Sequence, residues 1–240
     1  MNSRKVIVIV STVAGVVVIA LALWHFVFPS APEVMLNSSN LSQQRDAVAE
    51  LSASADSADG IERIAVAARH ENPKVACGAL RALVAGKAPG KPLPEPAVEV
   101  VETATRDSRP VVQLTAVQVL EATTPELPED TTVPEIVLRT FKQAKTPDVR
   151  IASANALGKF QYWQAMEPLL DAMEDDSVEV RSAAGMAVRR ILGLDYGFRA
   201  NAMLADRQAV LARLRREWRS SRRYHEKYAE RVQRARRGEQ

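Results

Sequence analysis

Two stretches in the second half of the chain decide the fold: residues 147–158 read PDVRIASANALG, and residues 178–189 read VEVRSAAGMAVR. Their Val-Arg pairs begin at Val149 and Val180, 31 residues apart. Counting backwards, Val112, Val75 and Gln44 hold the equivalent place, at spacings of 37, 37 and 31 residues. A sequence that repeats every ~20 to 50 residues is typical of a solenoid, in which each unit stacks on the next.

The same register places small residues on one helical face of every unit. The residue three places after each of these positions is small: Ala47, Gly78, Thr115, Ala152 and Ala183. Small residues let neighbouring helices approach closely, while larger ones further along, such as Leu157, fill the space between layers. Each helix is followed by a second apolar pattern at helical spacing, in residues 61–68, 98–104, 136–141 and 166–173. We therefore predict about five helical hairpins in which the helix with the Val-Arg position comes first.

Proline marks helix starts and linkers. Pro73, Pro110 and Pro147 stand just before the Val of their units, where proline suits the first turn of a helix. The two 37-residue spacings hold extra residues, which we place in proline-rich linkers at 88–96 and 124–130. Strand signals are scarce. The predicted fold class is all-α, an α-solenoid.

The composition agrees with this fold class and excludes several others. The 240 residues are 47% apolar and 25% charged, so the chain can bury a core and is not of the disordered class. Aromatic residues are only 5%, which favours thin helix-on-helix packing. The single cysteine, Cys77, excludes an intrachain disulfide and a cysteine-based zinc site, and the three histidines, at 25, 70 and 225, form no ligand motif.

The repeated residues resemble the HEAT repeat family, specifically the short bacterial HEAT-like repeats first named for phycobilisome lyases. The usual core of those repeats reads roughly Pro-Asp-x-Val-Arg-x-x-Ala-x-x-Ala-Leu-Gly, and residues 148–158 and 179–193 are similar to it. The resemblance covers about residues 40–193 and weakens toward Gln44. It implies the solenoid fold but no single activity, because such repeats occur in scaffolds, lyases and nucleic-acid enzymes alike.

The resemblance also implies a role for two arginines. Arg150 and Arg181 match the arginine of the family, which bridges to an acidic residue in the neighbouring turn. Asp148 and Asp176 are candidate partners. We expect structural ion pairs here rather than an anion-binding site.

The N-terminal segment from Val6 to Phe28 has 23 residues and no formally charged side chain. As a helix it would span roughly 35 Å, enough for the ~30 Å hydrocarbon core of a bilayer. A cleaved signal peptide is the alternative, because Arg4 and Lys5 precede the apolar run and residues 20–22 form an A-x-A pattern. The length of the run and the apolar terminus that cleavage would leave favour an uncleaved transmembrane helix.

Orientation follows from the flanking charges. Two basic residues precede the predicted span, and none follows it until Arg45. The positive-inside rule then places residues 1–5 in the cytoplasm and everything after the span outside, beginning with a linker at 29–40 and the repeat domain at 41–193. We expect a single-pass membrane protein whose repeat domain lies on the non-cytoplasmic side, in a bacterial inner membrane facing the periplasm.

Residues 194–240 are predicted to form a closing turn and a long basic helix from about 205 to 237. Residues 29–204 carry 18 Lys and Arg against 24 Asp and Glu, whereas residues 205–240 carry 12 against 5. Leu211, Leu214 and Trp218 are apolar enough to cap the open end of the solenoid, so the second half of the helix should project. His225 is interpreted as an exposed residue on the same stripe.

Arginines crowd the projecting half of this helix: Arg222, Arg223, Arg231, Arg234, Arg236 and Arg237. One interpretation is a solvated basic helix. The other is a binding site for an anion or a partner, since arginine favours planar, bidentate contacts with phosphate or carboxylate and gains energy near anionic lipid.

The sequence offers no visible active site. Glu174, Asp175 and Asp176 form a carboxylate cluster, but they lie where a HEAT-like unit has its acidic turn, so we interpret them as a turn rather than a metal site. Cys77 lies in an Ala- and Gly-rich helix, where burial is more probable than reactivity. No nucleophile elbow, phosphate loop or paired-histidine motif occurs. We expect no catalytic, metal-binding or cofactor-binding residues and no cofactor.

These observations lead to one functional expectation and two alternatives. We expect a non-enzymatic, membrane-anchored HEAT-repeat scaffold that holds a protein partner of unknown identity. The first alternative is a lyase-type or chromophore-handling protein. The second is binding of nucleic acid or anionic lipid through the basic C-terminal helix. The predicted topology speaks against nucleic acid, and a cytoplasmic location would favour it.

Overall fold

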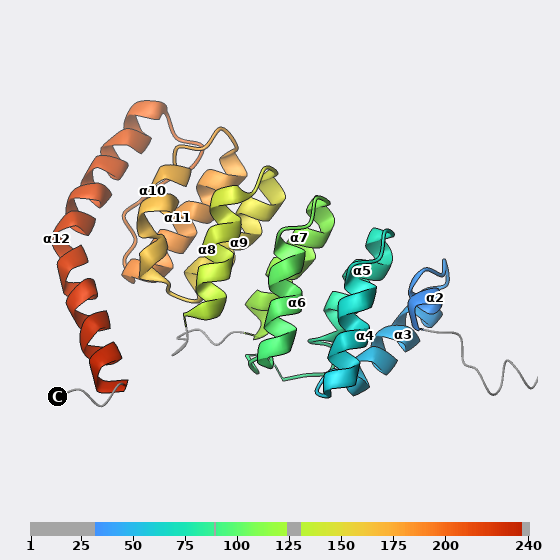
Figure 1. The fold of residues 1–240 in the computed structure, drawn as a ribbon. Helices are drawn as coiled ribbons and strands as arrows, with labels where there is room; N and C mark the ends of the chain where they lie inside the picture. Colours follow the sequence, from blue (N-terminus) through green and yellow to red (C-terminus); the bar gives the residue numbers. More distant parts are fainter. Residues whose placement is uncertain (1–31, 89, 124–130, 237–240) are drawn as a thin grey trace, which may run out of the picture.

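The computed structural model describes residues 32–88, 90–123 and 131–236, and all the regular elements within these ranges are helices (Figure 1). The helices are α2 (Pro32–Leu36), α3 (Leu41–Ser54), α4 (Ala58–Ala68), α5 (Pro73–Ala82), α6 (Glu95–Thr105), α7 (Pro110–Thr123), α8 (Thr132–Gln143), α9 (Pro147–Lys159), α10 (Met166–Ala172), α11 (Val178–Leu192) and α12 (Leu204–Arg236). A short 3-10 turn, η1 (Trp163–Ala165), leads into α10. The predicted all-α solenoid is confirmed.

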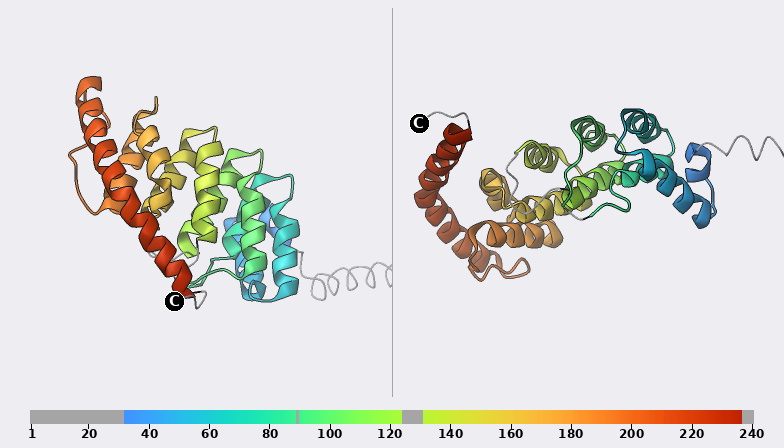
Figure 2. Two further views of the ribbon diagram at one scale, coloured as in Figure 1. Left: turned by 60° about the vertical axis from the view of Figure 1, so that its left-hand side comes forward. Right: turned by 90° about the horizontal axis from the view of Figure 1, so that it is seen from below.

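The helices form two layers. Those that carry the repeated Val position, α3, α5, α7, α9 and α11, pack side by side in one layer, and α4, α6, α8 and α10 form the other (Figure 2). Each helix of the first layer packs more extensively against the helix that precedes it in the sequence than against the helix that follows it. The hairpins are therefore α2–α3, α4–α5, α6–α7, α8–α9 and α10–α11. The prediction that this helix comes first in its hairpin is therefore wrong: it comes second.

Local sequence explains where the helices start and stop. Pro73, Pro110 and Pro147 are the first residues of α5, α7 and α9, as predicted, since the fixed φ of proline suits this position and its missing N–H is not needed there. Asn72 also caps α5, because its side chain accepts a hydrogen bond from the Lys74 N–H. Gly193 ends α11 in the left-handed conformation with φ of 69°, which glycine adopts without strain.

The predicted repeat register is confirmed in the core. The larger residues seven or eight places after the Val position are fully or almost fully buried: Leu51, Leu83, Leu120, Leu157 and Val188. Of the small residues, Ala152 is only half-buried. A close helix approach comes instead at Gly158, where an added Cβ would lie 2.6 Å from the Cα of Ala187. This contact joins α9 to α11.

The start of the array differs from the prediction. Residues 32–36, which we assigned to a linker, form α2, and the buried side chain of Leu36 packs against Gly78 of α5. A five-residue helix is too short to show a periodic apolar face, which is why it was missed. It supplies the first helix of the first hairpin.

The prediction of a single-pass membrane protein is not supported and is corrected here. Among residues 32–88, 90–123 and 131–236, no helix is both long and apolar enough to cross a membrane. Only α12 of the described helices has the length, and its 33 residues are rich in charge. The predicted span itself, with its ends Val6 and Phe28, lies outside the described residues. The predicted periplasmic location depended on the membrane assignment and is therefore not supported either.

The last helix closes the array as predicted. Leu211, Leu214 and Trp218 are almost completely buried against the final hairpin. Beyond them α12 runs along the α8–α10 side and diverges from the other helices (Figures 1 and 2). The C-terminal end of the core is therefore covered.

Candidate functional site

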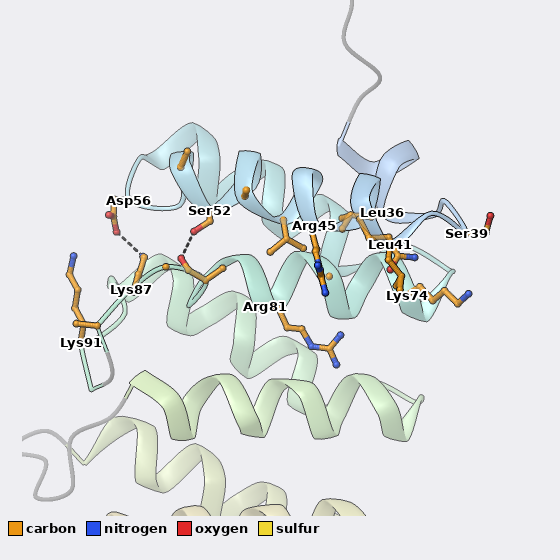
Figure 3. Close-up of a pocket in the computed structure, with 18 residues that line it drawn as sticks. Leu36, Ser39, Leu41, Arg45, Ser52, Asp56, Lys74, Arg81, Lys87 and Lys91 are labelled. Atoms are coloured by element: carbon orange, nitrogen blue, oxygen red, sulfur yellow. Dashed lines mark hydrogen bonds and ion pairs between the residues drawn. The ribbon is translucent and has the colours of Figure 1, made fainter.

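An open groove of about 1190 Å³ lies between α3 and α5, at the N-terminal end of the array (Figure 3). One wall extends from Leu41 along α3 to Asp56 in the turn that follows it. The other wall extends from Lys74 along α5 to Lys91 in the following turn. Both walls belong to the layer that carries the repeated Val position.

Contacts at both ends hold the groove open. At one end the Ser52 hydroxyl donates to the carbonyl of Ala85 at 2.5 Å, and the Lys87 ammonium pairs with Asp56 at 2.8 Å. At the other end Leu36 of α2 is seated on Gly78, where an added Cβ would lie 2.6 Å from the leucine Cδ2. The space between these two bridges is not filled by any side chain of the described residues.

The groove combines small aliphatic side chains with positive charge. Val48, Ala49, Ala53 and Ala85 supply the aliphatic surface, and both Ala49 and Ala53 are exposed. Five cationic residues line the groove: Arg45, Lys74, Arg81, Lys87 and Lys91. The single carboxylate among the lining residues is Asp56.

Four of the five cations have no ion-pair partner among the residues that the structure describes. The fifth, Lys87, is paired with Asp56. The hydrogen bond from Lys87 is the main reason that the pKa of the Asp56 carboxyl is lowered, and the charge of Lys91 contributes further. Within the part of the chain that the structure describes, no ion pair involves the exposed Arg45, Lys74, Arg81 or Lys91. The groove therefore presents uncompensated positive charge beside apolar surface.

The second candidate site, on the arginine-rich half of α12, is described only in part. Arg222 pairs with Glu226 at 2.7 Å, and Arg223 is exposed. The side chains of Arg231, Arg234, Arg236 and Arg237 lie outside the described residues. Nearer the core, Arg215 pairs with Asp171 at 3.2 Å and with Glu174 at 2.8 Å, so this arginine fastens α12 to α10.

An aromatic cluster on α12 was missed by the sequence analysis. His225 stacks on Trp163 of η1 at 5.9 Å and lies 5.6 Å from the buried ring of Trp218, so the prediction of an exposed histidine is wrong. Tyr224 meets the same imidazole edge-on at 6.0 Å. The signal available was the occurrence of Trp163 in an aromatic-poor sequence. The cluster holds α12 against η1.

The two arginines with a predicted structural role hold turns, but not through the carboxylates proposed. Arg150 pairs with Asp175 in the turn of the next hairpin, not with Asp148. Arg181 is buried and donates to backbone carbonyls, at Asp175, Asp176 and Ala200, rather than to a carboxylate. The guanidinium of Arg181 is therefore bound by backbone carbonyls, whereas the buried Nε of Arg150 has no hydrogen-bond partner among the described residues.

A third arginine, Arg109, also holds a turn, and this role was not predicted. Arg109 pairs with Asp107 through two short contacts, of 2.8 and 2.6 Å, and donates to the carbonyls of His70 and Glu71 in the preceding hairpin turn. Its hydrogen bonds lower the pKa of the Asp107 carboxyl. This role has little signal in the sequence, because Arg109 precedes its helix instead of standing at the motif position.

The remaining candidates take structural positions. Glu174, Asp175 and Asp176 lie in the turn between α10 and α11, where Asp175 accepts from the Ser177 N–H at 2.9 Å. Within the described residues no group of three or more His, Cys, Asp or Glu side chains could hold a metal ion. Cys77 is buried, with its sulfur 3.6 Å from the carbonyl oxygen of Val111.

Comparison with known proteins gives a family match. A model of HEAT repeats matches residues 98–189 and again residues 137–225, so the two matches together span more than half of the 240 residues. The match does not single out the lyase-type repeats. No curated protein matches the sequence.

Two engineered proteins are among the solved structures that are similar to the chain. An engineered protein, target OR329 of the Northeast Structural Genomics Consortium, is 18% identical, with 67% of this chain and 77% of that chain covered and a TM-score of 0.43. The designed armadillo repeat protein YIII(Dq)4CqI is 14% identical, with 75% and 88% covered and a TM-score of 0.41. At these scores the family assignment depends on the HEAT matches alone.

Proposed function

The chain belongs to the HEAT-repeat family, and from this premise we propose that it is a non-enzymatic scaffold that binds an acidic segment of a protein partner in the α3–α5 groove. Stacked helical repeats build extended surfaces on which partner proteins dock. The groove offers such a surface with a defined charge.

The observation that supports this proposal is a local reversal of charge. Residues 29–204 are acidic as a whole, with 24 Asp and Glu against 18 Lys and Arg. The groove, in contrast, is lined by five cations and one carboxylate. Opposite charges across an interface steer encounter and select partners. A partner that presents carboxylates beside small apolar residues is complementary to this lining.

The lining favours binding of protein over catalysis. It contains neither histidine nor cysteine, and its one carboxylate is occupied by Lys87. A chromophore-handling or lyase role would need groups that transfer protons or attack a substrate. The lysines and serines of the lining are of these types, but no histidine or unpaired carboxylate among the described lining residues is present to activate them.

Nucleic acid is the competing class of partner for a cationic groove. Grooves that bind single strands combine basic residues with aromatic side chains on which the bases stack. The residues that line the α3–α5 groove include no aromatic side chain. The apolar part of the lining is aliphatic and small, which suits the side chains of a peptide better than the faces of bases.

The test measures binding of a fluorescein-labelled, glutamate-rich peptide to the full chain by fluorescence anisotropy. We expect saturable binding that weakens with added salt, and a loss of at least about tenfold in affinity when Arg45 and Arg81 are both changed to glutamate. The matched control changes Arg69 and Lys142 to glutamate; these residues are also exposed cations, but they lie outside the groove, and affinity should be retained.

Two results would count against the proposal. One is an equal loss in the groove variant and in the control, which would mean that binding follows net charge alone. The other is tighter binding of a labelled single-stranded DNA of equal charge through the same two arginines, which would replace the protein partner with nucleic acid.

A further inference from the structure

We infer that the acidic segment held by the α3–α5 groove is a helix, with two carboxylates about two turns apart on the edge that faces α5. This inference rests on the proposed function and specifies the conformation and spacing of the partner. It follows from three properties of the groove: the hydrogen bonding of its walls, the size of its side chains and the positions of its cations.

The walls offer few backbone groups to an incoming chain. Both are helices, whose N–H and carbonyl groups bond within the helix. In the turn that follows α5, the N–H groups of Ala85, Lys87 and Lys91 already bond to Arg81, Val84 and Ala88, and the carbonyl of Ala85 accepts from Ser52. A helix satisfies its own main chain in such a groove, whereas an extended peptide would gain few main-chain hydrogen bonds from these walls.

The size of the side chains fits a third helix. Exposed Ala49 and Ala53 on α3 face a wall on which Ala85 is also small. Small residues allow two helix axes to approach to about 8 Å, the near end of the usual range. Helix α3, from Leu41 to Ser54, is about 20 Å long, which matches nearly four helical turns of a partner.

The cations set the spacing of the carboxylates. Lys74 and Arg81 are exposed, stand seven residues apart on α5 and lie on one wall (Figure 3). Seven residues are nearly two helical turns, or about 10.5 Å along the axis. Carboxylates at positions i and i+7 of a helix alongside α5 would meet both cations. Arg45 on the opposite wall would meet a carboxylate on the other edge of that helix.

The test compares two labelled peptides of about 16 residues that carry the same glutamates on an alanine background. In the first, a lactam bridge on the solvent side fixes the helix. In the second, two central alanines are replaced by proline, which prevents it. Anisotropy titration of the full chain should give a dissociation constant at least about tenfold lower for the helical peptide.

Two variants locate the binding site. Ala53→Trp fills the groove at an exposed position without a change of charge, and it should weaken the helical peptide by at least about tenfold. Lys142→Glu, on the other layer, should leave binding unchanged. Circular dichroism of each variant checks that the solenoid remains folded. Unaltered binding by a folded Ala53→Trp variant would overturn the inference, because the helical peptide would then lie elsewhere.

The outcomes separate this inference from the proposed function. Equal affinities for the helical and the proline-containing peptide, with both lost in the Arg45→Glu, Arg81→Glu variant, would overturn the helical partner and leave the acidic partner in place. Failure of both peptides to bind at millimolar concentration would overturn both proposals.

Discussion

Replacing Gly158 by alanine should destabilise the solenoid, although alanine is the better helix former. Gly158 lies near the end of α9, where that helix makes a close approach to α11. An added Cβ would lie 2.6 Å from the Cα and 2.9 Å from the Cβ of Ala187. Both of these atoms are fixed to the α11 helix, so no side chain can rotate out of the way.

The size of the effect follows from this geometry. Carbon atoms pack at about 3.5 Å or more, so α9 and α11 would have to separate by roughly 0.9 Å at this point. Overpacking of a tight core costs about 1–3 kcal/mol, and removal of a helical glycine returns up to about 1 kcal/mol. We expect a net loss of about 1–2 kcal/mol, equivalent to a fall in Tm of about 2–8 °C for a domain of this size.

Gly78→Ala is the matched control. Its added Cβ would also lie 2.6 Å from another atom, but that atom is the Cδ2 at the end of the Leu36 side chain, which can move. Its stability should change by less than about 0.5 kcal/mol, because the better helix propensity of alanine offsets the shift of Leu36. Urea unfolding of the full chain, followed by circular dichroism at constant m-value, measures both changes. The reasoning is refuted if Gly158→Ala is as stable as the unaltered chain or if the two variants lose equal stability.

Three further predictions concern single contacts. Leu157→Ala should cost about 2–5 kcal/mol, and the half-buried Ile191→Ala distinctly less, by urea unfolding; equal losses would contradict the burial pattern. The lowered pKa of Asp107 stabilises the fold above the unfolded value of about 3.9, and this stabilisation is lost as the pH falls toward the folded value. Asp107→Asn should therefore flatten the decline in stability below about pH 4, and an unchanged decline would argue against a role for its pairing with Arg109. Trp163→Ala removes one of the indole rings that contact the imidazole of α12; at pH 7 it should cost at least about 0.5–1.5 kcal/mol, and no loss would mean that this contact does not hold the helix.

Periodicity located the helices, but it could not show how they pair. An apolar stripe at helical spacing marks a buried face without naming the helix that covers it. Loop length held the missing signal. The turns that join α4 to α5 and α8 to α9 are only four and three residues long, whereas the links after α5 and α7 are the long proline-rich ones. Short loops join antiparallel neighbours, so loop length would have placed α5 and α9 second in their hairpins. It would not have placed α3, because a loop of three residues also joins α3 to α4.

The candidate groove could not be seen in the sequence because its cations are separated by up to 46 residues and meet only when hairpins stack. The repeat register nevertheless contains a partial signal. Lys74 and Arg81 stand one place before and six places after Val75. The corresponding residues around Val149 are Asp148 and Asn155, so the cationic pair is not a general property of the repeat.

Arg45 shows how a structural motif residue becomes available for binding. It follows Gln44 as Arg150 follows Val149, and it therefore holds the position of the family arginine in the first hairpin. Arg150 is occupied by Asp175, five residues before the Val position of the next hairpin, whereas the corresponding place for Arg45 holds His70. Without that carboxylate, Arg45 makes no ion pair among the described residues and lines the groove instead. A single difference in a turn, His70 in the place of the aspartate, thus leaves Arg45 available as part of a candidate binding surface. To detect such a difference, the arginine and its partner position must be compared together in each hairpin.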